Sequence, residues 1–387
     1  MDFAFTDQQE LMRQEVRRMC EKELNREYVR WMDEHCDFTP DELWNKIAAL
    51  GYMGISIPEK YGGMGLGMVD AMIVFEELAT ASTAVGLCIG ATIGFGAKTI
   101  MGLGTEKQKQ EILPKIAKGE LKFSMGLTEP GGGTDILGAI KTKAEDKGDH
   151  WLINGAKMFI TGAHRSDYMV LIAITDPAAK RTKGLSIFLV PQPSPGLTTK
   201  LIPKVGCHAA GTNEVVLEDV KVPKENLLGT KNNGWFELLG TLNPERIGTA
   251  MLSLGIAKAA FRDAMKYAQE REAFGGPISR FQILQHYLAD IAIEIECATN
   301  LIYKCAWLSD AGKPFHVEAS MAKLVAGRAS EKAAILGMEI LGGYGYTMEY
   351  DMQRYFRDYK QMIFSPISDE MAKNMIMQFM GLPKSWS

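Results

Sequence analysis

The sequence contains few cysteines and histidines, and neither type is grouped. The six cysteines are scattered through 387 residues without a C-x-x-C pair. This usage indicates reduced thiols in a cytosolic protein and not a disulfide framework. The six histidines are equally dispersed, and none lies four residues from another. Since metal sites gather such ligands at short spacings, we expect no bound metal.

A basic surface, a targeting peptide and a long apolar run are also missing. The net charge of −4 provides no positive field for nucleic acid. The N-terminus, MDFAFTDQQELMRQEVRR, has no apolar core flanked by basic residues and resembles neither a signal nor a transit peptide. No stretch approaches the ~18 uncharged apolar residues that a membrane helix requires. We therefore expect a soluble, cytoplasmic protein without a membrane or nucleic-acid partner.

Helical patterns dominate the first part of the chain, residues 1–118. Thr6 with Gln9, and Thr105 with Gln108, form capping-box pairs that open runs with apolar residues at helical spacing. The intervening loop IPEKYGGMGLG is rich in glycine, but it lacks the G-x-G-x-x-G pattern and the βαβ context of a dinucleotide fold. The sequence therefore predicts an N-terminal all-α domain.

The pattern changes twice after residue 118. Residues 119–229 hold short β-branched runs such as WLINGAKMFIT and LSIFLVP, which predict a middle domain built as an antiparallel β-barrel or sandwich. Residues 230–387 hold four long helical segments, which predict a C-terminal four-helix bundle. A chain of this length is expected to form two or three domains. The fold class is therefore α+β multidomain, in the order α, β, α.

The strongest local signal is the glycine-rich segment MGLTEPGGGTD, which runs from Met125 to Asp135. Consecutive glycines let a backbone approach a ligand closely and present its N–H groups. Thr128 and Thr134 add hydroxyl groups nearby. Glycine-rich segments are also common surface turns. From these residues alone, a ligand-binding loop and a plain turn are equally favoured.

Five segments, in order along the chain, resemble signatures of the acyl-CoA dehydrogenase family. TEPGGGTD is similar to the family's TEP-G-x-G-S-D signature, with Thr134 where serine is usual. NGAKMFIT, QEREAFGGPISRFQ, EILGGYGY and the N-terminal IPEKYGGMG match further family segments. The family's order of α, β and α domains is the order predicted above. The resemblance implies a homotetrameric FAD enzyme of fatty or alicyclic acid metabolism.

The resemblance also assigns residues to the cofactor. In relatives the flavin ring packs against the β domain, and the adenine half reaches a neighbouring subunit. Glu339 stands where relatives usually have glutamine. The residues expected to contact FAD are Met125, Leu127, Thr128, Gly133, Thr134, Phe159, Ile160, Thr161, Arg271, Phe274, Gln282, Glu339, Leu341, Gly342, Gly343, Ser368 and Glu370.

The catalytic base is expected at Glu245. A carboxylate suits the removal of a thioester's α-proton if burial raises its pKa. Many relatives carry this base near the C-terminus, where the matching position here is Pro366. Isovaleryl- and long-chain-type relatives instead carry it in a Glu-Arg pair, which matches Glu245 and Arg246. On cap statistics alone, Glu245 would be a surface acid in a helix opening with Asn243 as N-cap and Pro244 in the first turn.

Pro366 has a second consequence, because proline has no N–H to donate. In relatives the backbone N–H at this position donates to the thioester carbonyl, and losing such a donor typically costs ~3 kcal/mol. This absence favours an unusual substrate, with a branched, alicyclic or already unsaturated acyl group. The small residues of AVGLCIGATIGFGAK fit either a roomy acyl pocket or close helix packing. The expected substrate contacts are Thr134, Asn243, Arg246 and Pro366.

The resemblance favours a dehydrogenase that converts an acyl-CoA to an enoyl-CoA and passes electrons to an electron-transfer flavoprotein. The direction of the reaction is not set by the sequence. An enoyl-CoA reductase of the crotonobetainyl-CoA kind is therefore an alternative. A homologue that keeps FAD but has lost catalysis is another, against which Glu245 speaks weakly.

Overall fold

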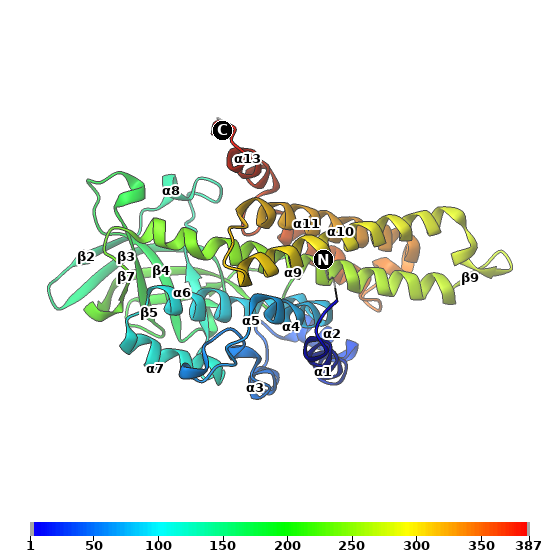
Figure 1. Ribbon diagram of the computed structural model, residues 1–387, viewed down its shortest axis with the longest axis horizontal. Helices are drawn as coiled ribbons and strands as arrows, with labels where there is room; N and C mark the ends of the chain where they lie inside the picture. Colours follow the sequence, from blue (N-terminus) through cyan, green and yellow to red (C-terminus); the bar gives the residue numbers. More distant parts are fainter. Residues whose placement is uncertain (1–3, 385–387) are drawn as a thin grey trace.

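The computed structural model describes residues 4–384, apart from the side chains of Arg181 and residues 241–243. A helical part comes first, a β-sheet second and a helical part last, which confirms the predicted α, β, α order (Figure 1). The long C-terminal helices extend away from the sheet and end at a small hairpin (Figure 1).

The N-terminal helices begin where the sequence places their caps. The Thr6 hydroxyl accepts a hydrogen bond from the backbone N–H of Gln9 at 3.2 Å, and the Gln9 side chain accepts one from the N–H of Thr6 at 3.1 Å. Thr105 and Gln108 form the same box. The elements of this part are α1 (Asp7–Glu23), α2 (Arg26–His35), α3 (Asp41–Ala49), η1 (Tyr52–Gly54), η2 (Glu59–Tyr61), α4 (Met68–Ala81), α5 (Thr83–Gly90), the π-helical η3 (Ala91–Ala97), α6 (Lys98–Leu103) and α7 (Glu106–Ala117).

One helical stretch corrects the expectation that the chain has no apolar run of membrane length. Thr83–Leu103, which comprises α5, η3 and α6, has a mean hydropathy of 1.5 and is long and apolar enough to cross a membrane by length and composition alone. In the fold 61% of this stretch is buried, and it packs against α4, β1 and the long helix α9. Because a core helix passes the same test, the stretch is weak evidence for a membrane span.

The middle part is one eight-stranded sheet in the order β6-β7-β3-β2-β4-β5-β8, with β1 beside β4. Most neighbours are antiparallel, as predicted, but β1 and β2 both pair parallel with β4. A parallel pair needs a long connection, and β2 and β3 lie between β1 and β4 in the chain. The elements are β1 (Phe123–Gly126), α8 (Ile136–Ala139), β2 (Lys143–Asp146), β3 (His150–Thr161), η4 (Ala163–Arg165), β4 (Tyr168–Ile174), η5 (Arg181–Lys183), β5 (Leu185–Pro191), β6 (Leu197–Leu201), β7 (Thr212–Pro223), η6 (Lys224–Asn226) and β8 (Leu227–Leu228).

Both faces of the central strand β4 are covered. Val170 and Ile172 pack in a cluster shared with α6 and α7, whereas Met169 and Leu171 pack in a cluster shared with β3 and β7. Successive side chains of a strand point to opposite faces. This double burial explains why β4 and β5 read as nearly continuous apolar runs. It also fixes the position of the glycine-rich segment, which begins within β1 at the side of β4.

The C-terminal part differs from the predicted bundle at two places. Its first helix begins at Gly234, so Asn243 is not an N-cap and Pro244 lies inside the helix. A further helix, α12, lies where no helical segment was predicted. The elements are α9 (Gly234–Glu270), β9 (Glu272–Ala273), β10 (Gly276–Pro277), η7 (Ile278–Arg280), α10 (Gln282–Asp310), α11 (His316–Leu341), η8 (Gly342–Tyr346), α12 (Met352–Phe364) and α13 (Asp369–Phe379).

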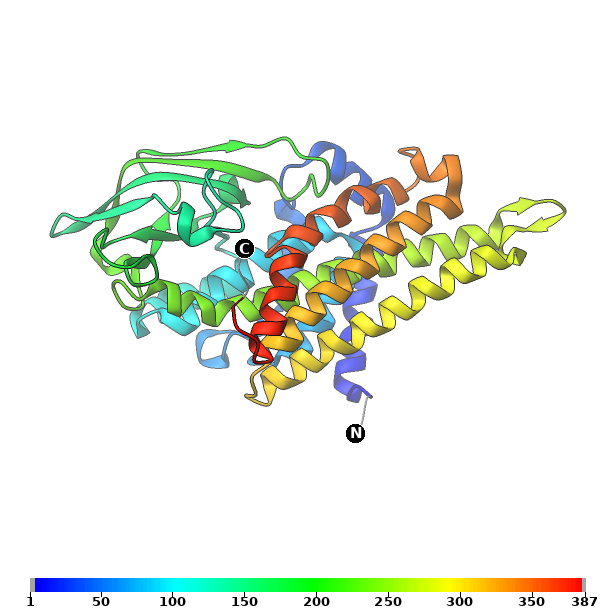
Figure 2. The same cartoon turned by 90° about the horizontal axis from the view of Figure 1, so that it is seen from above.

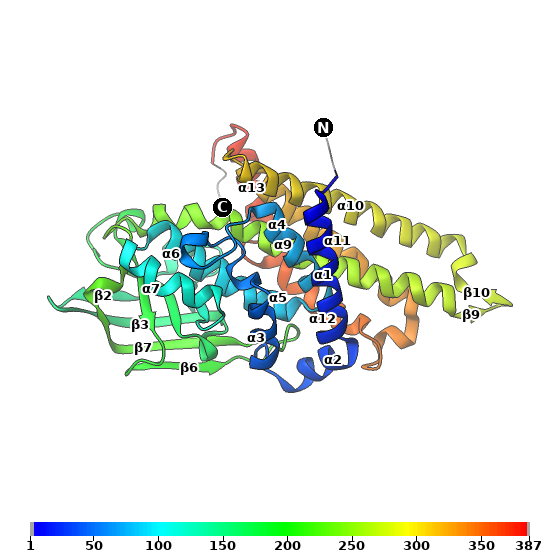
Figure 3. The same ribbon diagram turned by 60° about the horizontal axis from the view of Figure 1, so that its bottom comes forward.

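The two helical parts share one hydrophobic core. Buried residues of α4 and α5 belong to the same cluster as buried residues of α9, α10 and α11. Figure 2 shows α9, α10 and α11 running side by side, and Figure 3 shows α1 and α4 lying across them. The sequence places these segments in separate parts of the chain, but the fold brings them together. A largely apolar cavity lies at this junction.

Candidate active site

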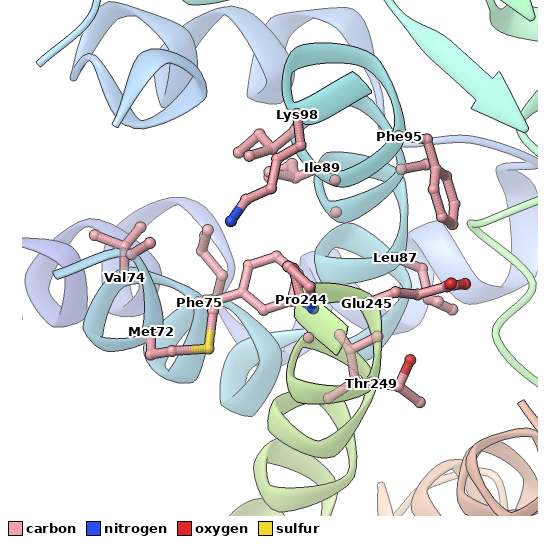
Figure 4. A pocket seen from close by; sticks show the side chains of 18 of the residues that line it. Met72, Val74, Phe75, Leu87, Ile89, Phe95, Lys98, Pro244, Glu245 and Thr249 are labelled. Atoms are coloured by element: carbon pink, nitrogen blue, oxygen red, sulfur yellow. The ribbon is translucent and has the colours of Figure 1, made fainter. Parts of the chain in front are cut away.

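The cavity between the two helical parts has a volume of about 170 Å³ and mostly apolar walls (Figure 4). Helices α4, α5, η3 and α6 form one side, and α9 and the end of α12 form the other. Its lining comprises Tyr52, Ile55, Ser56, Met68, Ala71, Met72, Val74, Phe75, Leu78, Leu87, Ile89, Gly90, Ala91, Ile93, Gly94, Phe95, Lys98, Thr161, Pro244, Glu245, Gly248, Thr249, Leu252, Gln361 and Ser365. Among these described residues, Glu245 is the one carboxylate and Lys98 the one basic side chain.

Glu245 is partly buried and lines the cavity from a position about three turns into α9. Burial raises its pKa to about 7, from an ordinary value of 4.5, against the opposing effect of the adjacent Arg246 guanidinium. A carboxyl group near neutrality exchanges a proton readily at physiological pH. The alternative interpretation of Glu245 as a surface acid at a helix opening is therefore wrong, because α9 begins eleven residues earlier, at Gly234.

Arg246 lies beside Glu245 but not in the cavity lining. It is 4% exposed, and its Nη2 donates to the Met375 sulfur of α13 at 3.5 Å. The expected substrate contact through Arg246 stays a prediction, and the side chain contacts α13 in this structure. The side chain of Asn243, another expected contact, lies outside the described residues.

The loop after α12 reaches the cavity from the other side. Gln361 and Ser365 both line it, and Pro366 follows Ser365 directly. The C-terminal position that lacks a carboxylate is therefore adjacent in sequence to a cavity residue, whose hydroxyl lines the cavity together with the Gln361 amide. Ser368 caps α13 by accepting from the N–H of Met371 at 3.3 Å, and Glu370 is exposed on the first turn of that helix.

The glycine-rich segment and NGAKMFIT are joined by a buried ion pair. The Lys157 ammonium lies 2.9 Å from a carboxylate oxygen of Glu129, and both side chains are nearly inaccessible. Burial alone would raise the pKa of Glu129, but Lys157 and the backbone of Thr142 outweigh it and hold that pKa below its ordinary range. Lys157 also donates to the Leu127 carbonyl at 3.2 Å. The pair therefore fixes TEPGGGTD against β3.

Strand β3 connects the glycine-rich segment to the cavity. The backbone N–H of Met158 donates to the Thr128 carbonyl at 2.9 Å. Phe159 has a left-handed φ of 62° and is 65% exposed, while Ile160 is buried. Thr161 then lines the cavity. A bulky residue in this strained conformation is rare outside functional sites.

The end of the glycine-rich segment lies on the surface. Gly131 and Gly133 have no atom within 4 Å of the place where a Cβ would stand. Thr134 is exposed. Met125, by contrast, is partly buried in β1 and packs against the cluster below β4. The start of the segment is thus anchored, and its end is free to contact a ligand.

The small residues of the Thr83–Leu103 stretch serve both of the purposes that the sequence left open. A Cβ on Gly86 would meet Leu252 at 2.6 Å, and one on Gly96 would meet Phe123 at 2.5 Å, which shows close packing. Gly94, in contrast, has nothing within 4 Å and lines the cavity.

A second pocket, of about 500 Å³, gathers another group of the predicted residues. Arg271, Glu339, Leu341, Gly342 and Gly343 line it together. Arg271 lies over the ring of Tyr344, with 5.7 Å between guanidinium carbon and ring centre. Phe274, in the adjacent hairpin, is 91% exposed, and Gln282 begins α10 as an exposed residue.

The FAD contacts predicted in the β-sheet part and those gathered at the second pocket do not meet within one chain. Arg271 follows the last turn of α9, about 40 Å along the axis from Glu245 at 1.5 Å per residue. The β-sheet lies at the opposite end of the molecule from the β9–β10 hairpin (Figure 1). One chain therefore presents two separate surfaces, as the resemblance implied for a cofactor that spans two subunits.

Lys98, Gln361 and Ser365 are among the cavity residues that the sequence analysis did not single out. A signal existed for Lys98, because it is the one charged residue of the apolar stretch Thr83–Leu103. No comparable signal marks Gln361 or Ser365, which reach the cavity through the packing of α12.

Comparisons with known proteins agree with this architecture over nearly the whole chain. Residues 6–120 match the N-terminal domain of acyl-CoA dehydrogenases, residues 124–220 the middle domain and residues 232–381 the C-terminal domain.

Individual relatives are similar over most of their length. Glutaryl-CoA dehydrogenase of Desulfococcus multivorans is 40% identical, covering 92% of each chain. The caffeyl-CoA reductase-Etf complex subunit CarC of Acetobacterium woodii is 38% identical, covering 92% of this chain and 93% of its own. The structure of butyryl-CoA dehydrogenase from Megasphaera elsdenii superposes with a TM-score of 0.94 at 36% identity, covering 98% of this chain and 100% of that one.

These relatives correct one part of the resemblance. The Glu-Arg pair pointed to the isovaleryl- and long-chain type, whereas the overall similarity is to glutaryl-CoA and short-chain enzymes. Membership of the family implies FAD as the cofactor. With all three domains matched, the chain belongs to the acyl-CoA dehydrogenase family and is an oxidoreductase acting on CH–CH groups.

Proposed function

We propose that this chain oxidises an acyl-CoA to the corresponding enoyl-CoA, with Glu245 as the base that removes the α-proton. The observation that carries the proposal is the position of Glu245. It is the one carboxylate among the described residues of an apolar cavity, and burial raises its pKa to about 7. This base placement is that of the isovaleryl- and long-chain type, although the chain as a whole is more similar to other members.

The cavity favours the proton transfer in two ways. Its walls are mainly aliphatic and aromatic side chains, which exclude water from the acyl group. A carboxylate with a pKa near the operating pH is ionised often enough to accept a proton and basic enough to hold it. Proton removal by Glu245 leaves negative charge on the thioester oxygen, which needs a donor.

Pro366 supplies no N–H for this oxygen. The Ser365 hydroxyl, on the same loop, lines the cavity and is the donor that we assign in its place. Because this donor is a rotatable hydroxyl, it tolerates a different placement of the carbonyl. A branched, alicyclic or already unsaturated acyl group therefore remains compatible with the site.

The residues present fit FAD. Phe159 is exposed two residues before the cavity-lining Thr161, and Gly131 and Gly133 are open, so these residues leave room where a flavin ring would be held. Arg271, with the open Gly342 and Gly343, would hold the pyrophosphate and adenosine of a partner subunit's cofactor. When bound, FAD supplies the acceptor for the β-hydride.

We further propose a cytoplasmic homotetramer that exchanges electrons with an electron-transfer flavoprotein. The separation of the two cofactor surfaces within one chain supports at least a dimer. The similarity to a subunit of a caffeyl-CoA reductase-Etf complex supports the electron partner.

The same similarity favours one alternative, reduction of an enoyl-CoA. The two directions use the same base and the same cofactor face, since Glu245 would return the proton that it otherwise removes. Direction therefore depends on the flavin potential and on the electron partner.

A panel of acyl-CoA thioesters mixed with the FAD-loaded enzyme tests the proposal. Straight-chain, branched, alicyclic and dicarboxylic thioesters are compared by loss of the oxidised flavin's visible absorbance under anaerobic conditions. We expect at least one thioester to bleach the flavin rapidly. Bleaching by none, together with reoxidation of chemically reduced enzyme by the matching enoyl-CoA, would favour the reductase. If neither bleaching nor reoxidation occurs, the proposal is wrong.

A further inference from the structure

Lys98 places a positive charge inside the acyl cavity. It is the first residue of α6, directly after the π-helical η3, and its side chain lines the cavity. In Figure 4 its ammonium group points into the space beside Met72 and Phe75, away from the carboxylate of Glu245. The surrounding wall there is apolar.

No carboxylate of the described chain forms an ion pair with Lys98. Its one hydrogen-bond contact is weak, from Nζ to the Met68 sulfur at 3.9 Å. The carboxylate that acts on it most is Asp310, at the end of α10. Asp310 is already engaged, because it accepts from the backbone N–H groups of Met68 at 2.6 Å and Val69 at 2.9 Å.

Burying the Lys98 ammonium without a partner costs free energy. Loss of hydration lowers the pKa of Lys98 to about 8, and Asp310 offsets this only in part. A buried ammonium normally has a counter-ion or a full set of acceptors. Here both are missing from the protein, while the group faces the space that an acyl chain would fill. A ligand anion is the chemistry that would complete the site.

We propose that Lys98 binds a carboxylate at the distal end of the acyl group, so that the substrate is a dicarboxylic acid joined to CoA through one of its carboxyls. The inference rests on the proposed function and names its substrate class. Glu245 takes the α-proton, the β-hydrogen leaves as hydride to the flavin, and a double bond forms between these carbons. The distal carboxylate is neither formed nor broken.

We expect an acyl group that ends in a methyl to bind the same cavity less tightly than one that ends in a carboxylate. It would bury the ammonium further and give it no acceptor, so binding would cost the desolvation of Lys98. A distal carboxylate gains a charge-assisted hydrogen bond at that point instead. Lys98 is therefore a specificity-determining residue and takes no part in the proton transfer.

The test compares matched pairs of thioesters on the FAD-loaded enzyme. Succinyl-, glutaryl- and adipyl-CoA are paired with butyryl-, valeryl- and hexanoyl-CoA, and kcat/KM is measured by flavin reduction. For at least one pair we expect the dicarboxylic thioester to be preferred roughly 10- to 100-fold, the size of a hydrogen bond to a charged group. We expect Lys98→Met to remove this preference mainly through KM, and Lys98→Arg to retain most of it.

Lys107→Met is the matched control, because it removes the same charge from an exposed position on the neighbouring helix α7. It should leave the preference unchanged. Binding of β-thia analogues, in which sulfur replaces the β-carbon, is measured by calorimetry and needs no turnover. The analogue with a distal carboxylate should bind wild type more tightly than it binds Lys98→Met.

The outcomes separate the two proposals. If methyl-ended thioesters bleach the flavin as well as dicarboxylic ones and Lys98→Met changes neither, the inference is wrong while the oxidation stands. If no thioester bleaches the flavin, the proposed function fails, while the binding of the β-thia analogues still tests the role of Lys98. A preference for a dicarboxylic thioester that survives in Lys98→Met would also overturn the role of Lys98.

Discussion

Two regions of the fold each bury a glutamate and a lysine, but these two side chains form an ion pair in only one of the regions. Beneath the glycine-rich segment, Glu129 and Lys157 meet at 2.9 Å. In the cavity, Glu245 and Lys98 line one space without forming an ion pair. In the first region the charges satisfy each other and hold two segments together. In the second they are left for a ligand. Pairing marks a structural role, and its absence marks a functional one.

The largest stability effect should come from breaking the paired region. In Lys157→Met the buried carboxylate of Glu129 loses its partner, which typically costs about 3 to 5 kcal/mol. The unfolding midpoint of the FAD-loaded protein in denaturant measures this loss. Lys46→Met, which removes an exposed partner of Glu23 and Glu42, is the control and should cost less than about 1 kcal/mol.

The double variant Glu129→Gln/Lys157→Met sharpens the same comparison. It leaves no unpaired buried charge, so it should recover part of the stability lost in Lys157→Met. A Lys157→Met protein as stable as wild type would show that the pair does not anchor the segment.

In the cavity, we expect the substitution Glu245→Gln to raise the stability, by less than Lys157→Met lowers it. The pKa of Glu245 is raised from 4.5 to about 7 in the fold, so the native state holds a proton that the unfolded chain releases over this range. Stability therefore falls as pH rises through the window. Glu245→Gln should be more stable than wild type by at most about 3 kcal/mol near pH 8, with the difference shrinking towards pH 5. Melting both proteins across this range checks the sign, and a destabilised variant near pH 8 would contradict it.

The sequence predicts the regular parts of the fold from local patterns. Strands β3, β4, β5 and β7 lie where β-branched runs were found. The four-residue strands β1 and β2 were missed, because their pairing with β4 depends on contacts distant in sequence. The start of α9 was misplaced, because Pro244 looks like a first-turn proline but lies within a helix held by tertiary packing.

The site was only partly predictable for the same reason. Glu245 was found through resemblance, but its raised pKa comes from burial between helices of different parts of the chain. Lys98 was missed, because an isolated lysine in an apolar stretch does not reveal which space it faces. Ser365 reaches the cavity through a loop whose position depends on α12 and α13.

The central claim is that Glu245 acts as the base, and the pH dependence of flavin reduction tests it most directly. In wild type, kcat/KM for the best thioester should rise with pH and level off with an apparent pKa near 7, because the free enzyme must carry Glu245 as carboxylate. In Glu245→Gln with FAD retained, the rate should fall roughly 100- to 10,000-fold and lose this dependence. A variant that reduces its flavin at the wild-type rate, with the same pH profile, would contradict the account.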